Sequence, residues 1–230
     1  MDELLEVARE CAEAWGLELE EPFPSLHSLV VPAGDAVLKL NVTWHFEAEH
    51  EADALAAWGG KGAVRLLARD DERRALLVER CRPGTHLGHH AIDEVLELLP
   101  RLSVDADGPF RLLADEADRW LEELPGRGYP AELVDYALDV LRSVDRAARH
   151  LVNQDLHGEN LLAAEREPWL VIDPKPLLGE RELDAVGPLR NASDPARWLD
   201  ALAGLGLDRE RMRGWASRMR SPGTTRRRRS

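Results

Sequence analysis

The spacing of the apolar residues changes near residue 82, and this change limits the folds open to the chain. Before it, short apolar runs are separated by polar turns, at 29–32, 36–40, 62–68 and 75–79. Runs of this kind, bounded by turn residues, are typical of strands joined in hairpins. The stretch 47–58 has helical composition. The first part of the chain is therefore predicted to be a small antiparallel sheet with one key helix laid against it.

Helical spacing dominates after residue 82. Apolar residues recur at steps of three and four, which predicts helices over 92–99, 115–124 and 131–151, and Pro100 is expected to end the first of them. Two short strands are predicted at 161–163 and 169–172, followed by loops and by two further helices, 196–202 and 209–219. The fold class that follows is α+β.

This pattern predicts three regions along the chain. Residues 1–82 form a sheet-rich N-terminal lobe, and residues 83–220 form a mainly helical C-terminal lobe. Residues 221–230, which contain four consecutive arginines, are expected to be a disordered basic tail.

Composition restricts the setting and the partners. No apolar run approaches the length of a membrane span, and the acidic N-terminus lacks the apolar core of a signal peptide. Cys11 and Cys81 are too few for a disulfide framework, so the expected location is cytoplasmic. The net charge is −13, which disfavours a nucleic-acid partner and would attract a cationic small molecule. The simpler explanation of the same charge is that it keeps the protein soluble.

Four polar residues next to apolar segments have the chemistry that phosphoryl transfer requires. Such a reaction needs oxygen ligands for Mg2+, a carboxylate beside the attacking hydroxyl and a cation on the nucleotide phosphates. Asp155 and Asn160 lie in one polar stretch between apolar segments, and Asp173 ends the strand predicted at 169–172. Lys39 lies inside an apolar strand, where a charge needs a partner, and Glu51 on the next helix is a candidate.

Each of these residues also has an ordinary structural explanation. Lys39 could extend its charge to solvent from an edge strand, and Asp173 before a proline could be a turn former. An Asp and an Asn five residues apart arise easily by chance in a chain with 19 aspartates and four asparagines. Chance does not readily explain why all these residues occur in this order and on suitable elements. The sequence contains neither a Gly-x-Ser-x-Gly elbow nor a GxxxxGK[ST] loop, so it does not support a hydrolase or a P-loop protein.

Several motifs resemble those of one kinase family in the same order along the chain. They are AVLKL (36–40), EHEA (49–52), GAVRLL (62–67), ALLVER (75–80) followed by Pro83 and Gly84, DLHGEN (155–160), and WLVIDPK (169–175) followed by Gly179 and Glu180. The family is that of the aminoglycoside and hydroxyurea antibiotic-resistance kinases, the streptomycin 6-kinase branch of the protein-kinase-like superfamily. The resemblance implies a bilobal protein-kinase-like fold that binds MgATP between its lobes.

The resemblance also implies roles for matching residues. Asp155 would be the catalytic base, Asn160 and Asp173 would hold Mg2+, and Lys39 would contact the ATP phosphates. Glu51 would brace Lys39, with Glu49 as the alternative.

Three further matches lie around these groups. The backbone from Glu79 to Cys81 would form the hinge that reads adenine, and Asp184 would brace the catalytic loop from behind. Lys175 matches the family without an assigned role. His157, inside the loop, is expected to pack or hydrogen-bond that loop.

The leading hypothesis is an ATP-dependent O-phosphotransferase with Mg2+ as cofactor. Its acceptor would be a small polar molecule, which is either hydroxyurea or a cationic aminoglycoside-type antibiotic such as streptomycin. One alternative is a degenerate kinase that binds nucleotide or a partner without efficient turnover. This alternative rests on Asn153-Gln154 where the family has His-Gly, on a glycine-free turn at 24–28 and on a short C-terminal end. A second alternative is a small-metabolite kinase of another branch.

Overall fold

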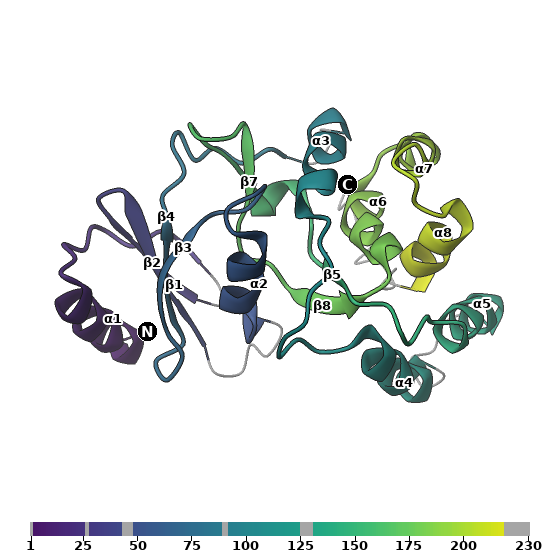
Figure 1. The fold of residues 1–230 in the computed structure, drawn as a ribbon, viewed down its shortest axis with the longest axis horizontal. Coiled ribbons are helices and arrows are strands. Elements are labelled where there is room, and N and C mark those ends of the chain that lie inside the picture. The colour runs from purple at the N-terminus through teal and green to yellow at the C-terminus, as the bar shows by residue number, and fades with distance from the viewer. Residues whose placement is uncertain (1, 26–27, 43–47, 89–91, 125–130, 219–230) are drawn as a thin grey trace, which may run out of the picture.

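A four-stranded antiparallel sheet forms the first part of the fold, with the strand order β1-β2-β4-β3 (Figure 1). Its strands are β1 Ser28–Ala33, β2 Ala36–Asn41, β3 Leu66–Asp70 and β4 Ala75–Glu79. The computed structural model describes residues 2–25, 28–42, 48–88, 92–124 and 131–218. The predicted basic tail lies outside these residues, as do positions 26–27 of the glycine-free turn.

The two faces of this sheet carry different residues because side chains alternate along a strand. On β2, Leu38 and Leu40 are fully buried in a cluster that includes Cys11 of helix α1 (Asp2–Trp15). Lys39 therefore points to the opposite face, where helix α2 (Glu51–Trp58) lies between the sheet and the rest of the molecule (Figure 1). The alternation of β2 thus delivers a lysine to the inner side of the sheet.

The remaining chain is mainly helical and carries two small two-stranded sheets. Its helices are α3 Ile92–Leu102, α4 Leu113–Glu123, α5 Ala131–Arg142, α6 Val186–Asn191, α7 Pro195–Ala203 and α8 Arg209–Arg218, with short 3-10 helices η3 Gly158–Asn160 and η4 Arg181–Ala185. Its strands are β5 His150–Asn153, β6 Leu161–Ala163, β7 Trp169–Val171 and β8 Pro176–Gly179. β5 pairs with β8, and β6 pairs with β7, both antiparallel.

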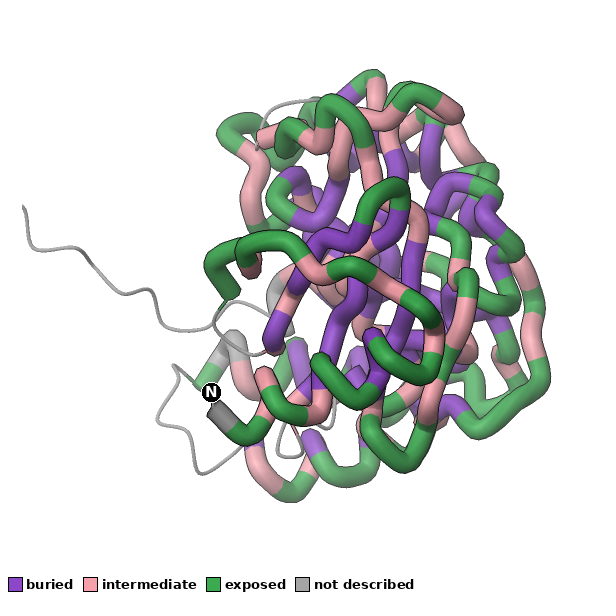
Figure 2. The backbone as a smooth tube through the Cα atoms, turned by 90° about the vertical axis from the view of Figure 1, so that its left-hand side faces the viewer, coloured by how far each residue is buried: buried purple, intermediate pink, exposed green. Residues whose placement is uncertain are grey.

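The largest apolar cluster crosses from the sheet-bearing part into the helical part. It contains Leu55 and Trp58 of α2 together with Leu98 and Leu102 of α3. The indole N–H of Trp58 donates to the carbonyl of Leu102 at 3.0 Å. Figure 2 shows that the buried backbone is concentrated in the interior and that exposed segments surround it. The lobe boundary at residue 82 remains a proposal about chain organisation, since this core is continuous across it.

Two predicted helix ends are wrong. Helix α3 continues through Pro100 to Leu102, because burial of Leu98, Leu99 and Leu102 outweighs the local cost of a proline in its last turns. Helix α5 ends at Arg142 rather than near residue 151.

The segment after α5 explains the second error. Asp145 makes a turn there, its side chain accepting the N–H of Ala147 at 2.9 Å, and the chain then enters β5. Strands β5 and β8 were not predicted, since each pairs with a segment far away along the chain. The polar stretch around Asp155 therefore follows a strand, not a helix.

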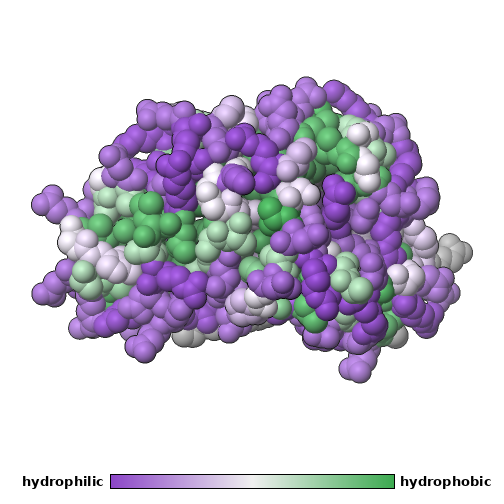
Figure 3. All heavy atoms as spheres, viewed as in Figure 1, coloured by the Kyte–Doolittle hydropathy of each residue, from purple (hydrophilic) through white to green (hydrophobic). Residues whose placement is uncertain are grey.

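The surface hydropathy and the lengths of the helices complete the description of the fold. On the face shown in Figure 3, hydrophilic residues predominate, and hydrophobic residues gather over the sheet and beside the helices at upper right. Within the described ranges, no helix combines the length and apolarity needed to cross a bilayer.

Candidate active site

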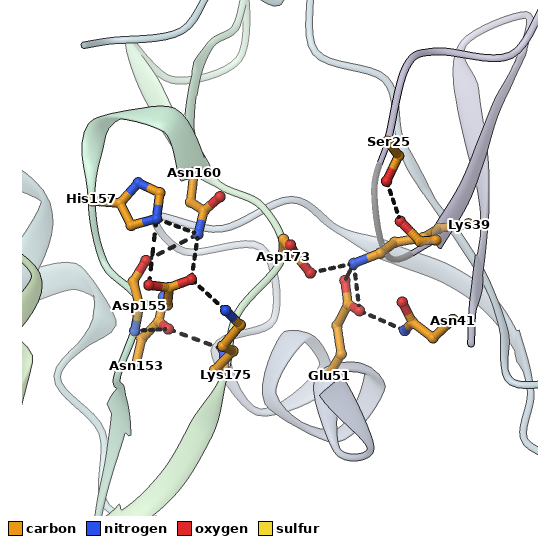
Figure 4. A network of polar contacts seen from close by, with 11 residues as sticks. Ser25, Lys39, Asn41, Glu51, Asn153, Asp155, His157, Asn160, Asp173 and Lys175 are labelled. Atoms are coloured by element: carbon orange, nitrogen blue, oxygen red, sulfur yellow. Dashed lines mark hydrogen bonds and ion pairs between the residues drawn. The ribbon is translucent and has the colours of Figure 1, made fainter. Parts of the chain in front are cut away.

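Lys39 and Glu51 form a buried ion pair on the inner face of the sheet. Lys39 Nζ lies 2.8 and 2.7 Å from the two carboxylate oxygens of Glu51 and 2.6 Å from Asp173 Oδ1 (Figure 4). Lys39 is 7% exposed and Glu51 is 2% exposed. Burial works against the charged ammonium, but the carboxylates of Glu51 and Asp173 outweigh it and raise the pKa of Lys39. Glu49, the alternative partner, is exposed.

Asn41 is a further member of this cluster that was not predicted. Its amide nitrogen donates to Glu51 Oε2 at 2.8 Å, and the residue is 6% exposed. Asn41 stands two positions after Lys39 on β2, so both side chains point to the same face of the sheet. The alternation of the strand was a signal that could have identified it.

A cavity of about 520 Å³ lies against this cluster. Lys39, Asn160 and Asp173 contribute polar groups to its wall. Its apolar wall residues are Val30, Val37, Val64, Val78, Leu162 and Ile172. A mainly apolar pocket with a few convergent charged groups is the usual form of a cofactor site.

The predicted hinge residues line the same cavity, and the side chain of Glu79 is held by Arg166. Arg166 belongs to the turn between β6 and β7, and it donates to Glu79 Oε2 at 3.1 Å, Gly60 O at 2.6 Å and Ala63 O at 3.0 Å. Burial works against the Glu79 carboxylate, but hydrogen bonds from Arg166 and the Arg65 N–H lower its pKa. Arg166 thus connects the helical part of the molecule to the end of β4.

Cys81 follows this clamp and forms part of the cavity wall. Burial raises the pKa of its thiol to about 11, so it is not a reactive thiolate at neutral pH. The N–H of Arg80 is bonded to Asp35 O at 2.8 Å. In the part of the chain that the structure describes, the N–H of Cys81 donates to no backbone carbonyl, so it is a donor that a ligand could use.

Asp155 forms a second ionic centre, in the loop between β5 and η3. Lys175 Nζ lies 2.6 Å from its Oδ2, Arg190 Nη2 lies 3.2 Å from its Oδ1, and His157 Nε2 lies 3.4 Å from Oδ1. Burial raises the pKa of Asp155, but hydrogen bonds from His157 and Lys175 outweigh it and hold the pKa well below its ordinary value. The carboxylate is therefore ionised throughout the neutral range.

Asn160 connects this centre with the cavity. Its amide nitrogen donates to the backbone carbonyl of Asp155 at 3.0 Å, and the residue lines the cavity together with Asp173 (Figure 4). Since the nitrogen is engaged, the side-chain oxygen of Asn160 is the atom left for a ligand. One amide oxygen and one carboxylate fit Mg2+, which prefers oxygen ligands and keeps several waters. The described residues contain no cluster of three or more His, Cys, Asp or Glu side chains suited to a metal.

Asp184 supports the Asp155 loop from behind. Its Oδ1 accepts the backbone N–H of Asn153 at 2.7 Å, and its Oδ2 lies 3.8 Å from His150 Nε2. Burial raises the pKa of Asp184 to about 7. This position agrees with the bracing role that the family resemblance implied, although the role itself stays a prediction.

Two glycines let other backbone segments approach the loop closely. A Cβ atom on Gly158 would lie 1.6 Å from the carbonyl oxygen of Gly88, and one on Gly187 would lie 2.0 Å from that of Leu156. Real Cβ atoms do not come this close to backbone oxygens. The loop is therefore packed backbone to backbone on both sides.

With this geometry in view, comparison with known proteins identifies the family. The chain matches the family described as aminoglycoside/hydroxyurea antibiotic resistance kinase over residues 18–228. The chain belongs to this family. The resemblance found in the motifs is thereby confirmed.

Relatives of this family member include a hydroxyurea phosphotransferase and a streptomycin 6-kinase. A hydroxyurea phosphotransferase of Kitasatospora aureofaciens is 38% identical, over 90% of this chain and 68% of the relative. A streptomycin 6-kinase of Streptomyces glaucescens is 37% identical, over 78% of this chain and 66% of the relative. The matched region thus spans about two thirds of the length of these two relatives.

Solved structures confirm the α+β, protein-kinase-like fold. The choline kinase LicA from Streptococcus pneumoniae superposes with a TM-score of 0.67 at 11% identity, over 93% of this chain and 85% of that chain. LicA in complex with AMP gives a TM-score of 0.62, over 89% of this chain and 80% of that one.

The structure brings the predicted residues of this antibiotic-resistance-kinase family member into two groups joined by Asn160. Lys39, Glu51 and Asp173 are in direct contact, whereas Asp155 contacts Lys175 and His157. The residues that sequence reasoning missed are Asn41, Arg166 and Arg190, and it treated Asn153 only as a departure from the family motif. Arg190 lies on the short helix α6, and nothing in the local apolar pattern marks it.

Proposed function

We propose that the chain transfers the terminal phosphate of ATP to a hydroxyl group of a small polar molecule. The observation that carries the proposal is the place of Asn160. Its amide contacts Asp155, and it lines the same cavity as Lys39 and Asp173. Asn160 thus links a cavity of about 520 Å³ to the Asp155 carboxylate, and this link supports the proposed reaction.

In this proposal, ATP occupies the cavity between the sheet and the helical part. The apolar walls cover adenine, and the backbone at Glu79 and Cys81 reads its edge. Lys39, held by Glu51, contacts the phosphates. Asn160 and Asp173 would hold Mg2+, which when bound neutralises phosphate charge.

Asp155 receives the proton of the acceptor hydroxyl. As the hydroxyl oxygen forms its bond to the terminal phosphorus, the bond from that phosphorus to the ADP oxygen breaks, and the O–H proton passes to the carboxylate. The low pKa of Asp155 keeps it ionised before this step, so it accepts a hydrogen bond from the hydroxyl and orients it. Its main contribution is then orientation, which suits the loose transition state of phosphoryl transfer.

The acceptor is proposed to be an aminoglycoside-type antibiotic, such as streptomycin, or hydroxyurea. The names of the two relatives support these classes, and the net charge of −13 favours a cationic molecule through long-range attraction. The comparisons favour neither a kinase without turnover nor a kinase of another branch.

The test is a panel of acceptors incubated with MgATP and analysed by mass for an added phosphate. Streptomycin, hydroxyurea and choline represent the candidate classes. Wild type is expected to phosphorylate one of the first two, and Asp155→Ala is expected to lower turnover by about 100-fold to 10,000-fold. Wild type without any phosphorylated product, or a substitution without effect, would contradict the proposal.

A further inference from the structure

Asn153 is the last residue of β5 and lies directly below Asp155 in the loop. It is 1% exposed. Its side-chain oxygen accepts two backbone N–H groups, that of Asp155 at 3.1 Å and that of Lys175 at 3.0 Å (Figure 4). A single carbonyl therefore bridges the two residues whose side chains form the ion pair of the second centre.

The orientation of this side chain is determined by chemistry. Both neighbours are N–H donors, so only the oxygen of the Asn153 amide can face them. The amide nitrogen is then buried and has no hydrogen-bond partner within the described residues. A buried donor without a partner lowers the stability of the fold. Asn153 thus keeps its accepting oxygen at the expense of an unsatisfied nitrogen.

Further contacts hold the end of β5 beside the residues that lead into β8. The N–H of Asn153 donates to Asp184, and the N–H of Gln154 donates to the carbonyl of Lys175 at 3.1 Å. In the β5–β8 pairing, Asn153 stands opposite Pro176. Lys175 is therefore positioned by its backbone, and from this position its Nζ reaches Asp155 Oδ2 at 2.6 Å.

We propose that Asn153 is a positioning residue for phosphoryl transfer, whose side-chain carbonyl sets the Asp155–Lys175 pair. This inference rests on the function proposed above. Asn153 stands where the family motif has histidine, so it supplies by another route the support that the loop requires. Loss of the carbonyl frees the backbone of both partners, and a displacement of about 1 Å can lower the rate by about 100-fold.

The test is a double-mutant cycle on kcat with Asn153→Leu and Lys175→Met. Leucine matches asparagine in size and removes the accepting oxygen. Each single substitution is expected to lower kcat by about 100-fold, with little change in KM for ATP. Because both act on one ion pair, the double variant is expected to lie close to Lys175→Met, rather than to show the product of the two effects.

The control is Ser143→Ala, which removes a hydroxyl that donates to Val140 O at 3.1 Å and belongs to neither the cavity wall nor the two ionic centres. It is expected to keep kcat within about two-fold, as is usual for a substitution away from reacting groups. If Asn153→Leu does not fold, Asn153→Ser replaces it in the same cycle, since the shorter hydroxyl cannot accept both N–H groups.

The outcomes separate the two proposals. Effects that multiply in the cycle, or a normal kcat for Asn153→Leu, would overturn the positioning role while the proposed function stands. An Asn153→Leu variant that changes KM for ATP and keeps the wild-type kcat would also overturn it. Absence of turnover in wild type with every acceptor would remove the proposed function and this inference together.

Discussion

The two ionic centres beside the cavity differ in their burial. Lys39 and Glu51 keep 9% and 3% of their side-chain surface exposed, whereas Lys175 and Asp155 keep 22% and 17%. Removing one partner of a buried ion pair leaves an uncompensated charge, which is strongly destabilising. A partly exposed pair contributes less to stability because water screens its charges. The first centre should therefore influence folding as well as reaction, and the second mainly the reaction.

The centres also differ in what holds them. Lys39 is carried by a strand in the interior of a four-stranded sheet, so the alternation of that strand sets its direction. Asp155 lies in a loop, and its place depends on side-chain bonds to backbone groups, above all those of Asn153. The comparison teaches that one site can combine a lysine fixed by regular structure with a carboxylate fixed by a few hydrogen bonds.

The largest effect is expected for Lys39→Met. It leaves Glu51 buried without its cation and should lower the free energy of unfolding by about 3–5 kcal/mol, with loss of turnover. Denaturant unfolding and the phosphorylation assay measure the two quantities. The matched variant Lys39→Met/Glu51→Leu removes both charges and should regain stability but not turnover. If Lys39→Met is as stable as wild type, or if the double variant is active, the two centres do not differ in the way described.

A smaller effect on stability, with a clear effect on rate, is expected for Lys175→Met. Its partner Asp155 remains in contact with Arg190 and His157, so the free energy of unfolding should fall by about 1 kcal/mol or less. Turnover should fall by about 100-fold, because the carboxylate loses its closest anchor. Equal destabilisation by Lys175→Met and Lys39→Met would show that exposure does not separate the two pairs.

Arg166→Ala is expected to act on nucleotide binding. The substitution removes the bonds from Arg166 to Glu79, Gly60 and Ala63, so the hinge next to Cys81 loses its fixed position. KM for ATP should rise several-fold, about 1 kcal/mol of binding, with little change in KM for the acceptor. The control is Arg119→Ala, on the exposed side of α4, where no change is expected. If KM for the acceptor rises instead, Arg166 does not act on nucleotide binding.

A pH dependence of stability is expected from Asp184. Burial raises its pKa to about 7 in the folded protein, above the ordinary value of an aspartate in the unfolded chain. The folded state then binds more protons than the unfolded state between roughly pH 4 and pH 7, so stability is lost as pH rises through this window. Urea unfolding at several pH values should show this loss in wild type and not in Asp184→Asn. The exposed neighbour Asp105→Asn serves as control and should retain the wild-type profile.

Local pattern was sufficient for much of the fold and for the first centre. The two hairpins of the N-terminal part follow from short apolar runs bounded by turns, and Lys39 stands out as a charge inside one of these runs. The pairing of β5 with β8 joins segments that no local period connects, so β8 and the end of α5 were missed. The role of Asn153 could not be seen either, because its two acceptor bonds exist only after Lys175 has been brought beside it.

The backbone packing around Gly158 and Gly187 has a consequence for selection experiments. Any side chain at either position would occupy the space of a carbonyl oxygen, that of Gly88 or that of Leu156. In a library randomised across this segment and selected for resistance, both positions should stay glycine whatever the antibiotic. They would therefore act as an internal standard for loss of folding, against which tolerance at the acceptor-facing positions can be measured.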